Sequence, residues 1–424
     1  MLRRMTALPA VSPIRLIAVV SAAQVCAMWG FSTFPALQPT LIDAWSLTNT
    51  EAGWINGIFF LAYVFTVPLL AGLTDRQSAR HIFLASVVLT GLANLGFALA
   101  ADGFWSALVL RGAAGVAFSG IYMPGLKLLT DHLEARWPEG EHSRGVSFYT
   151  AALGLGAAFS YFIAGQAAEI WNWQAAFAIA GSGAIIAVAI MLIGLPRPDP
   201  PVIPPAVGTR ISLLPDFRPA FRSRAVIAHV LAYATHSFEV IGFRSWLVSY
   251  LVFIAATRDE AGGMDVATAA SIAAALSLLA PVSSIAGNEA ARRWGRVAIG
   301  SAIAAAALGV GVAIGGTAVT DITWVVTAVV ALSLFYTILI NGDSSVLTAG
   351  LVAVAPAGAK GATMAVYSAA GMIGAGLGPL VFGMVLDVVG GGQATAAAWF
   401  WAFAINAIVG VSGPLALRLM LKGR

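Results

Sequence analysis

Charged residues are scarce in this sequence: Asp, Glu, Lys and Arg make up 10% of its 424 residues, against about 25% in soluble proteins. Hydrophobic residues account for 59% of the chain, and the mean hydropathy is +0.87. A soluble globule of this length could not cover its surface with so few polar side chains. The composition therefore excludes soluble enzymes, nucleic-acid-binding proteins and disordered scaffolds, and predicts a protein that crosses a lipid bilayer several times.

Residues that carry chemistry are scarce as well. The single cysteine, Cys26, lies in an apolar stretch, so an intrachain disulfide is excluded. The five histidines are scattered and predict no metal site. No phosphate-binding pattern of the form G-x-x-x-x-G-K-[ST] occurs, so this chain encodes no ATP-driven pump. We expect no catalytic residues, no metal, no cofactor and no nucleic-acid partner.

Apolar runs, by contrast, are long and numerous. A helix that crosses the hydrocarbon core needs about 20 apolar residues, and twelve segments meet this requirement. They are residues 14–40, 53–73, 81–101, 104–129, 146–167, 174–195, 225–256, 267–287, 297–317, 323–349, 361–388 and 395–417. The runs lack the alternating period of barrel strands. The sequence thus predicts an all-α polytopic membrane protein with 12 transmembrane helices.

Basic residues divide unequally between the loops on the two sides of these helices. If the N-terminus is placed in the cytoplasm, 19 of the 23 basic residues fall in cytoplasmic segments, and one, Arg258, falls outside. Cytoplasmic loops of membrane proteins are enriched in Lys and Arg. The pattern predicts a multi-pass protein of the cell inner (plasma) membrane with both termini in the cytoplasm. The basic pI of 9.4 then reflects topology rather than a polyanionic partner.

Proline is concentrated in one polar connection, residues 196–222. Pro196–Pro205 holds six prolines in ten positions, which is typical of an extended tether. This connection divides the twelve spans six and six. The sequence therefore predicts an N-terminal bundle over 1–195, a cytoplasmic linker over 196–222 and a C-terminal bundle over 223–424.

The two halves resemble each other at an offset of 218 residues. Tyr149–Glu169 aligns with Tyr367–Asp387 without a gap. The matched pairs include Tyr149 with Tyr367, Gly165 with Gly383, and Glu169 with Asp387. A repeat of six helices has both copies in the same orientation, which predicts two six-helix bundles related by a pseudo-twofold axis along the membrane normal.

The loop between the second and third spans carries a family signature. Gly72–Arg80 reads G-L-T-D-R-Q-S-A-R and is similar to the pattern G-x-L-x-D-R-x-G-R-[RK] of the major facilitator superfamily of secondary transporters. Asp75, Arg76 and Arg80 fit the pattern, whereas Ser78 replaces a glycine. We expect Asp75, Arg76 and Arg80 to form a cytoplasmic gate, because an acid in such a loop is not needed for topology. The alternative is a plain positive-inside loop.

Two further motifs support the resemblance. Arg111-x-x-x-Gly115 resembles R-x-x-x-G-x-G in the fourth span, and Trp173–Phe177 resembles the W-R-x-x-F opening of the sixth. On these motifs the chain is identified as a member of the superfamily. The resemblance implies two bundles around a central cavity that opens alternately to each side of the membrane. It also implies that the first, fourth, seventh and tenth spans line this cavity.

Five charged residues interrupt the apolar spans, and all of them lie on the fourth, seventh and tenth. They are Arg111, Lys127, Glu239, Arg244 and Asp343. A charge at the bilayer centre costs at least about 2.5–3.5 kcal/mol, so those that persist are functional candidates. Their sum is positive, which favours an anionic solute.

The seventh span is the richest in polar residues. His236 and Glu239 are spaced i, i+3 and share a helix face. A histidine near a carboxylate in a low dielectric titrates near neutral pH. We therefore expect His236, Glu239 and Asp343 to couple transport to protons, and Arg244 to bind the solute. The alternative is a structural ion pair.

The tenth span contains a helix-breaking pair, Asn341-Gly342, followed by Asp343. At the repeat offset, Gly125 corresponds to Asp343, which places Lys127 near the same level. We expect Lys127 and Asp343 to pair across the two bundles and, with Arg111, to act as a gate. The alternative for Lys127 is that its side chain reaches to the membrane surface.

Aromatic and polar residues complete the predicted solute site. With His236, Glu239 and Arg244, the residues expected to bind the solute are Gln24, Trp29, Tyr122, Tyr149, Tyr336 and Tyr367. The alternative is that these aromatic residues serve only in packing.

These observations predict a secondary active transporter, acting as a monomer in the bilayer, that moves a small organic or inorganic anion by alternating access with proton coupling. The alternative is a proton-driven exporter of multiple drugs or hydrophobic compounds, in which Glu239 or Asp343 would titrate. The fifth span has Ser160-Tyr161 where antiporters of the family carry Gly-Pro, which weighs against that alternative. A non-transporting receptor is disfavoured because the chain has no large soluble domain.

Overall fold

The fold is known from a computed structural model. It describes residues 12–73, 77–137, 142–195, 199, 217–257, 263–321, 323–356 and 359–421. Within these ranges every regular element is a helix, which confirms the all-α prediction. Eleven segments are long and apolar enough to cross a membrane, and the shorter α1 adds to them. The predicted number of spans is thus reached when α1 and the helix that follows it are counted as one.

The N-terminal bundle contains eight helices that build the first six spans. They are α1 (Pro13–Ala27), α2 (Thr33–Trp45), α3 (Asn49–Leu73), α4 (Ala79–Ala100), α5 (Phe104–Phe118), α6 (Tyr122–Arg136), α7 (His142–Ile170) and α8 (Trp173–Gly194). The first span is α1 followed by α2, and the fourth is α5 followed by α6. Each of these two spans is therefore broken once in the middle.

The C-terminal bundle also has six spans and two breaks, of which the break in the tenth span matches the one in the fourth. Its helices are α9 (Arg218–Arg222), α10 (Arg224–Thr257), α11 (Val266–Ser277), α12 (Ala280–Trp294), α13 (Arg296–Val319), α14 (Val325–Gly342), α15 (Ser344–Val354), α16 (Lys360–Gly390) and α17 (Ala396–Leu421). The eighth span is α11 with α12, and the tenth is α14 with α15. The break in the tenth span falls at Asp343, directly after the Asn341-Gly342 pair. Most of the predicted linker lies outside the described residues, so the domain boundaries stay predictions.

The bundles meet along two seams, α3 against α16 and α7 against α11. Glycines allow the helices to approach closely there. A Cβ atom added at Gly57 would collide with the carbonyl of Gly376, and one added at Gly165 would lie 2.7 Å from the Cβ of Ala270. Gly383, the repeat partner of Gly165, packs against Asn49. Two glycines that match in the repeat therefore lie at different seams, Gly165 at α7–α11 and Gly383 at α3–α16.

Asp387 holds one end of the α3–α16 seam. Its carboxylate accepts the backbone N–H of Asn49 at 3.1 Å and that of Thr50 at 2.7 Å. It also accepts the Asn49 amide at 2.8 Å and the Thr50 hydroxyl at 2.6 Å. A carboxylate from one bundle thus caps the N-terminus of a helix in the other, where free N–H groups and the helix dipole favour negative charge. Following the predicted topology, we call this end of the molecule the outer side.

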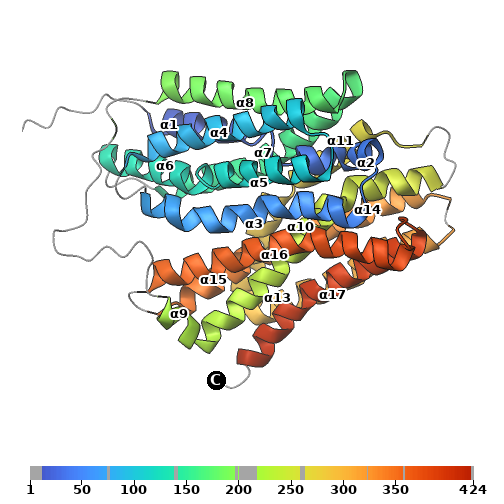
Figure 1. The fold of residues 1–424 in the computed structure, drawn as a ribbon. Helices are drawn as coiled ribbons and strands as arrows, with labels where there is room; N and C mark the ends of the chain where they lie inside the picture. The colour runs from blue at the N-terminus through green and yellow to red at the C-terminus, as the bar shows by residue number, and fades with distance from the viewer. Residues whose placement is uncertain are drawn as a thin grey trace, which may run out of the picture.

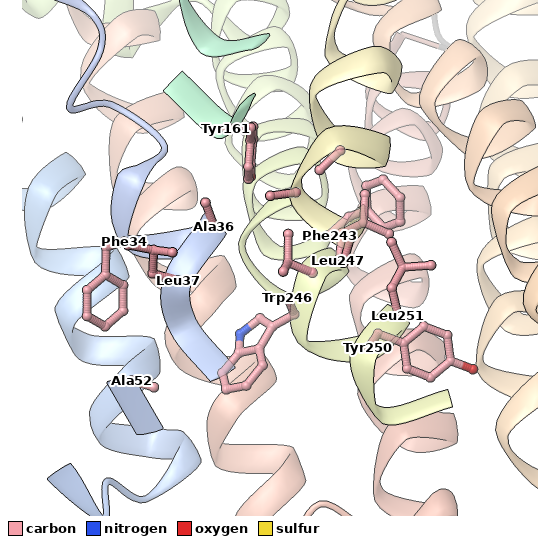
Figure 2. Packing of buried hydrophobic residues seen from close by; sticks show 14 of the residues in the cluster. Phe34, Ala36, Leu37, Ala52, Tyr161, Phe243, Trp246, Leu247, Tyr250 and Leu251 are labelled. Atoms are coloured by element: carbon pink, nitrogen blue, oxygen red, sulfur yellow. The ribbon is translucent and has the colours of Figure 1, made fainter. Parts of the chain in front are cut away.

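The largest core cluster lies on the same side and crosses from one bundle to the other. Phe34 and Leu37 of α2 belong to it together with Phe243 and Trp246 of α10, as Figure 2 shows. Toward the opposite, inner side, α10 and α17 slope away from the N-terminal bundle (Figure 1). The structure is therefore a conformation in which the bundles are closed together at the outer side.

Candidate functional site

A pocket lies between the bundles, bordered by the α1–α2 break and by α3, α5, α7 and α10. It holds about 350 Å³ of space, including its opening. Its polar lining residues are Ser32, Asn56, Arg111, Tyr161, Arg244 and Ser245, and no carboxylate is among the lining residues that the structure describes. We call it the interbundle pocket. Two guanidinium groups, one from each bundle, therefore face one space.

Arg111 reaches this pocket from α5. Its side chain is 2% exposed and donates hydrogen bonds to the carbonyls of Gly30, at 3.1 Å, and Phe31, at 3.3 Å. These carbonyls belong to the break between α1 and α2, where helical hydrogen bonds are missing. The guanidinium also lies 4.7 Å from the ring centroid of Phe59. Arg111 thus stabilises the break in the first span by hydrogen bonds to its carbonyls. The gating role of Arg111 stays a prediction.

Arg244 reaches the pocket from α10. Its guanidinium donates to the side-chain oxygen of Asn341 at 3.2 Å, and its backbone carbonyl accepts the Tyr161 hydroxyl at 2.7 Å. Both hydrogen-bonding partners are uncharged. Because Arg111 also bonds to neutral carbonyls, the charges of the two guanidinium groups are not neutralised by these contacts.

His236 pairs with Asp343. The His236 Nδ1 atom lies 2.8 Å from Asp343 Oδ1, and both side chains are buried. The contact joins α10 to the break of the tenth span. Lys127, which we expected to pair with Asp343, instead contacts Asp131 at 3.0 Å on its own helix. The predicted Lys127–Asp343 pair is therefore wrong for this conformation. Positions that match in the repeat occupy equivalent places in separate bundles, so the match does not bring their side chains into contact.

Glu239 is oriented away from the interbundle pocket. Its carboxylate accepts the Tyr336 hydroxyl at 2.7 Å and packs against Gly410 of α17. It therefore lies among α10, α14 and α17, inside the C-terminal bundle. His236, three residues earlier, is bonded to Asp343 at the break, so the two side chains that share a face in the sequence have different partners. The predicted contribution of Glu239 to a solute site is not supported by this placement.

Tyr149 and Tyr367, which match in the repeat, each contact a span that is broken in the middle. Tyr149 is fully buried and donates toward the carbonyls of Ile121 and Tyr122, at 3.3 and 3.2 Å, where α5 gives way to α6. Its ring stacks on that of Tyr122. In the other bundle, the Tyr367 hydroxyl lies 3.1 Å from that of Thr348 on α15. Both tyrosines thus contact the inner half of a broken span.

The remaining predicted binding residues lie outside the interbundle pocket. Gln24 is buried and donates to the Tyr149 carbonyl at 3.4 Å. Trp29 packs against Gly183 of α8, and Tyr336 is bonded to Glu239. Of the nine residues predicted to bind the solute, Arg244 alone is among the described residues that line this pocket.

Asn56 and Tyr161, on the second and fifth spans, line this pocket but are not among the binding residues predicted from the sequence. These spans were not among those that the family resemblance assigns to the cavity. Asn56 is 1% exposed and its amide donates to the side chain of Gln38. A buried amide within an apolar span is a signal that could have identified this residue.

Part of the predicted cytoplasmic gate forms a cluster at the inner side. Arg80 Nε lies 3.0 Å from the Asp199 carboxylate, which also contacts the His132 ring at 3.4 Å and the Ser78 hydroxyl at 3.0 Å. Burial raises the pKa of Asp199, but the hydrogen bonds from His132 and Ser78 and the charge of Arg80 outweigh it and lower the pKa below the ordinary value of 3.8. Arg80 thus ties the start of the linker to the N-terminal bundle.

The other two residues of that predicted gate, Asp75 and Arg76, lie outside the described residues. The gating roles of Asp75, Arg76 and Arg80 stay predictions.

Comparison with protein families matches residues 20–353 to the Major Facilitator Superfamily. The niacin transporter NiaP of Acinetobacter baylyi is 27% identical over 161 residues, covering 37% of this chain and 34% of that protein. The hexuronate transporter of Escherichia coli is 26% identical over 184 residues, covering 43% and 41%. Human protein spinster homolog 1 is 21% identical over 232 residues, covering 52% and 42%. The chain thus spans about a third to two fifths of the length of these relatives.

Solved structures share the whole fold. A bacterial homologue of the human lysosomal transporter Spinster, in an inward-facing and occupied conformation, matches with a TM-score of 0.73 and 16% identity, covering 97% of this chain and 96% of that one. The nucleoside transporter NupG matches with a TM-score of 0.74 and 15% identity, covering 96% and 99%. These matches confirm the predicted arrangement of helices.

Proposed function

The chain belongs to the Major Facilitator Superfamily, and from that premise we propose that it transports a small organic anion across the inner (plasma) membrane by alternating access, coupled to protons. One observation carries the proposal. Arg111 of the N-terminal bundle and Arg244 of the C-terminal bundle line the same pocket, and their hydrogen-bonding partners there are neutral. A carboxylate on the solute carries the negative charge that complements these two positively charged guanidinium groups.

The chemistry of arginine supports an anionic solute. A guanidinium binds carboxylates through paired, charge-assisted hydrogen bonds, which are stronger than neutral ones. An anion bound to both Arg111 and Arg244 would connect the two bundles in this conformation. The anion would lose one of these two partners when the bundles separate. Such a difference in contacts between two states is what a solute needs to shift their populations.

The other walls of the pocket favour an organic anion over an inorganic one. Phe31, Phe60 and Ile241 line it together with the two arginines. The named solutes of two relatives, niacin and hexuronates, both combine a carboxylate with an organic ring. A cationic drug would meet two positive charges in this pocket, which disfavours the alternative of a multidrug exporter.

The break in the tenth span supports proton coupling. Asn341, which accepts from Arg244, and Asp343, which pairs with His236, flank Gly342. A change of protonation at the His236–Asp343 pair would alter the geometry of the break, and Asn341 would pass that change to Arg244. Glu239, bonded to Tyr336, is a further group able to hold a proton.

The proposal includes the predicted topology, with both termini in the cytoplasm, and a monomer as the functional unit. The topology rests on the unequal division of basic residues between the loops on the two sides of the membrane.

Uptake by purified protein in liposomes tests the proposal. The probes are radiolabelled nicotinate and glucuronate, with a pH gradient imposed across the membrane. Loss of a charged hydrogen bond of about 1.5–3 kcal/mol predicts at least about a tenfold weaker apparent affinity in Arg244→Gln. Arg293→Gln is the matched control, because Arg293 is 68% exposed and pairs with Glu289 at the surface. Unchanged affinity in Arg244→Gln, or a wild-type preference for organic cations, would contradict the proposal.

A further inference from the structure

A second pocket lies inside the C-terminal bundle near its inner side. It is bordered by α10, α13, α15 and α17 and holds about 430 Å³ of space, including its opening. Its polar lining residues are His229, Arg296, Ser301 and Asp343. We call it the C-bundle pocket. None of its described lining residues belongs to the interbundle pocket, so the two spaces are separate.

Asp343 belongs both to the lining of the C-bundle pocket and to the His236–Asp343 pair. The carboxylate lines the pocket, and the imidazole of His236 lies beyond it, stacked on Tyr233, which in turn stacks on Tyr367. At the other end of the pocket, Arg296 is exposed. The pocket therefore runs from an exposed residue to a buried carboxylate.

We propose that the C-bundle pocket is a water-accessible site through which protons pass between the inner side and the His236–Asp343 pair, by a route that the solute does not share. The inference rests on the proposed proton coupling. A proton moves between a buried carboxylate and solvent only through water or other titratable groups. The pocket supplies both a space and polar groups at its wall, which water needs in order to stay.

The charged and titratable groups around Asp343 come from several helices. His229 and His236 lie on α10, and Glu239 lies one turn further toward the outer side. Arg296 begins α13, and its guanidinium donates to the Ala349 carbonyl at 3.2 Å. Tyr367 of α16 lies on the His236 side. The pocket residues from α17 are Pro414, Leu417 and Leu421, which do not titrate.

His229 and Arg296 suit an exit for protons. The His229 Nδ1 atom is bonded to the Ala225 carbonyl at 2.8 Å, which fixes the ring at the pocket wall. Arg296 lines the pocket at its inner end, where its side chain is exposed. A proton released from the pair therefore meets a histidine and then the inner surface.

The repeat shows that this pocket is particular to the C-terminal bundle. At the offset of 218, Gly125 takes the place of Asp343, and it packs against Phe83 and the Tyr149 hydroxyl. Asp199, which follows α8 at the start of the linker, is bonded to Arg80 and His132 of the N-terminal bundle. The inner end of the N-terminal bundle is thus filled by an ion cluster where the C-terminal bundle has a pocket.

Gly300 offers a way to plug the pocket. It lies on α13 and lines the pocket, and a Cβ atom added there meets nothing within 4 Å. The Cβ atom of a leucine at this position therefore meets no neighbour, and we expect the rest of the Gly300→Leu side chain to occupy the pocket. We expect this variant to lose pH-gradient-driven accumulation of nicotinate or glucuronate and to keep solute exchange, which requires no net proton movement. Gly309→Leu is the matched control, because Gly309 lies on the same helix with open surroundings outside the pocket.

A second measurement does not depend on how Gly300→Leu folds. Ser301→Cys in a Cys26→Ser background is purified and then modified with a positively charged thiosulfonate. Modification should reduce gradient-driven accumulation and spare exchange. Equal loss of both activities, or no loss of driven accumulation after either treatment, would overturn the separate route. A wild-type protein that exchanges solute but shows no gradient-driven uptake would instead contradict the proposed coupling itself.

Discussion

At the scale of single residues, four buried charged residues on the fourth, seventh and tenth spans each have a different kind of partner. Asp343 has an imidazole, Glu239 a tyrosine hydroxyl, Arg244 an amide and Arg111 two carbonyls. Burial of a charge is costly unless it is paired or well hydrogen-bonded. The two arginines are satisfied as hydrogen-bond donors but keep their net charge, which makes them the groups that an anion can neutralise.

The Asp199 cluster gives a prediction at this scale. The pKa of Asp199 is lowered in the folded protein, so its stabilising effect is complete above the ordinary value of 3.8 and is lost as the pH falls through the lowered value. Asp199→Asn should remove about 1–3 kcal/mol of stability at neutral pH, because it removes the ionised partner of buried Arg80. The apparent melting temperature in detergent should fall relative to wild type.

The pH dependence makes this prediction specific. The difference between wild type and Asp199→Asn should be present at pH 7 and shrink below pH 3.8. Glu134→Gln is the control, because Glu134 is exposed on α6. A difference that is the same at both ends of this pH range would show that the carboxylate charge is not what stabilises the cluster.

The charges themselves could be predicted from the sequence, but their partners could not. Arg111, Glu239 and Arg244 stand out because apolar spans rarely contain charge. Their partners depend on how each helix is rotated and where it breaks, which composition does not determine. Lys127 shows this limit, since its partner Asp131 lies one turn away while the sequence argument placed the partner in the other bundle.

At the scale of helices, close glycine contacts hold the bundles together. Gly57 of α3 meets the backbone of Gly376 in α16, and Gly53 meets that of Pro379. Without a hydrophobic driving force in lipid, helices associate through such close packing. The ungapped repeat could predict which glycines are used, because Gly165 and Gly383 match. It could not predict their contact partners, which lie in the other half of the chain.

Gly57→Ala tests this seam. Alanine normally stabilises a helix relative to glycine by roughly 0.5–1 kcal/mol, yet here the added methyl group must separate α3 from α16. We therefore expect a lower apparent melting temperature and slower transport. Gly112→Ala is the matched control, because its Cβ atom would lie 3.4 Å from the Ile58 side chain, an ordinary contact. If both variants behave alike, the seam does not depend on close backbone approach.

At the scale of the whole molecule, the structure shows a conformation that is closed at the outer side, which the proposed alternating access requires as one of its states. Asp387 caps α3 from the opposite bundle, and the shared core of Phe34, Phe243 and Trp246 lies on the same side. The twelve-span plan could be predicted from hydropathy and charge, and the repeat from the ungapped match at an offset of 218 residues. The closed outer side could not, because under the proposed mechanism one sequence must specify every state of the cycle.

Asp387→Asn should shift the molecule toward states that are open at the outer side. Loss of the charge removes its interaction with the α3 N-terminus, an effect of about 1 kcal/mol, or roughly fivefold in population. The measurement is the rate at which an impermeant thiol reagent, added outside, modifies Ser245→Cys in a Cys26→Ser background. Glu169→Gln, the repeat-equivalent change, is the control. Equal rates in the two variants would show that Asp387 is not an outer lock.

The central claim is that the interbundle pocket recognises negative charge. Binding of two matched pairs to the purified wild-type protein, nicotinate against nicotinamide and glucuronate against glucuronamide, tests it most directly. Each pair differs mainly in the charge that would face Arg111 and Arg244. We predict that the acid of each bound pair binds at least about tenfold more tightly than its amide, as expected for charge-assisted hydrogen bonds. Amides that bind as tightly as the acids would contradict the account.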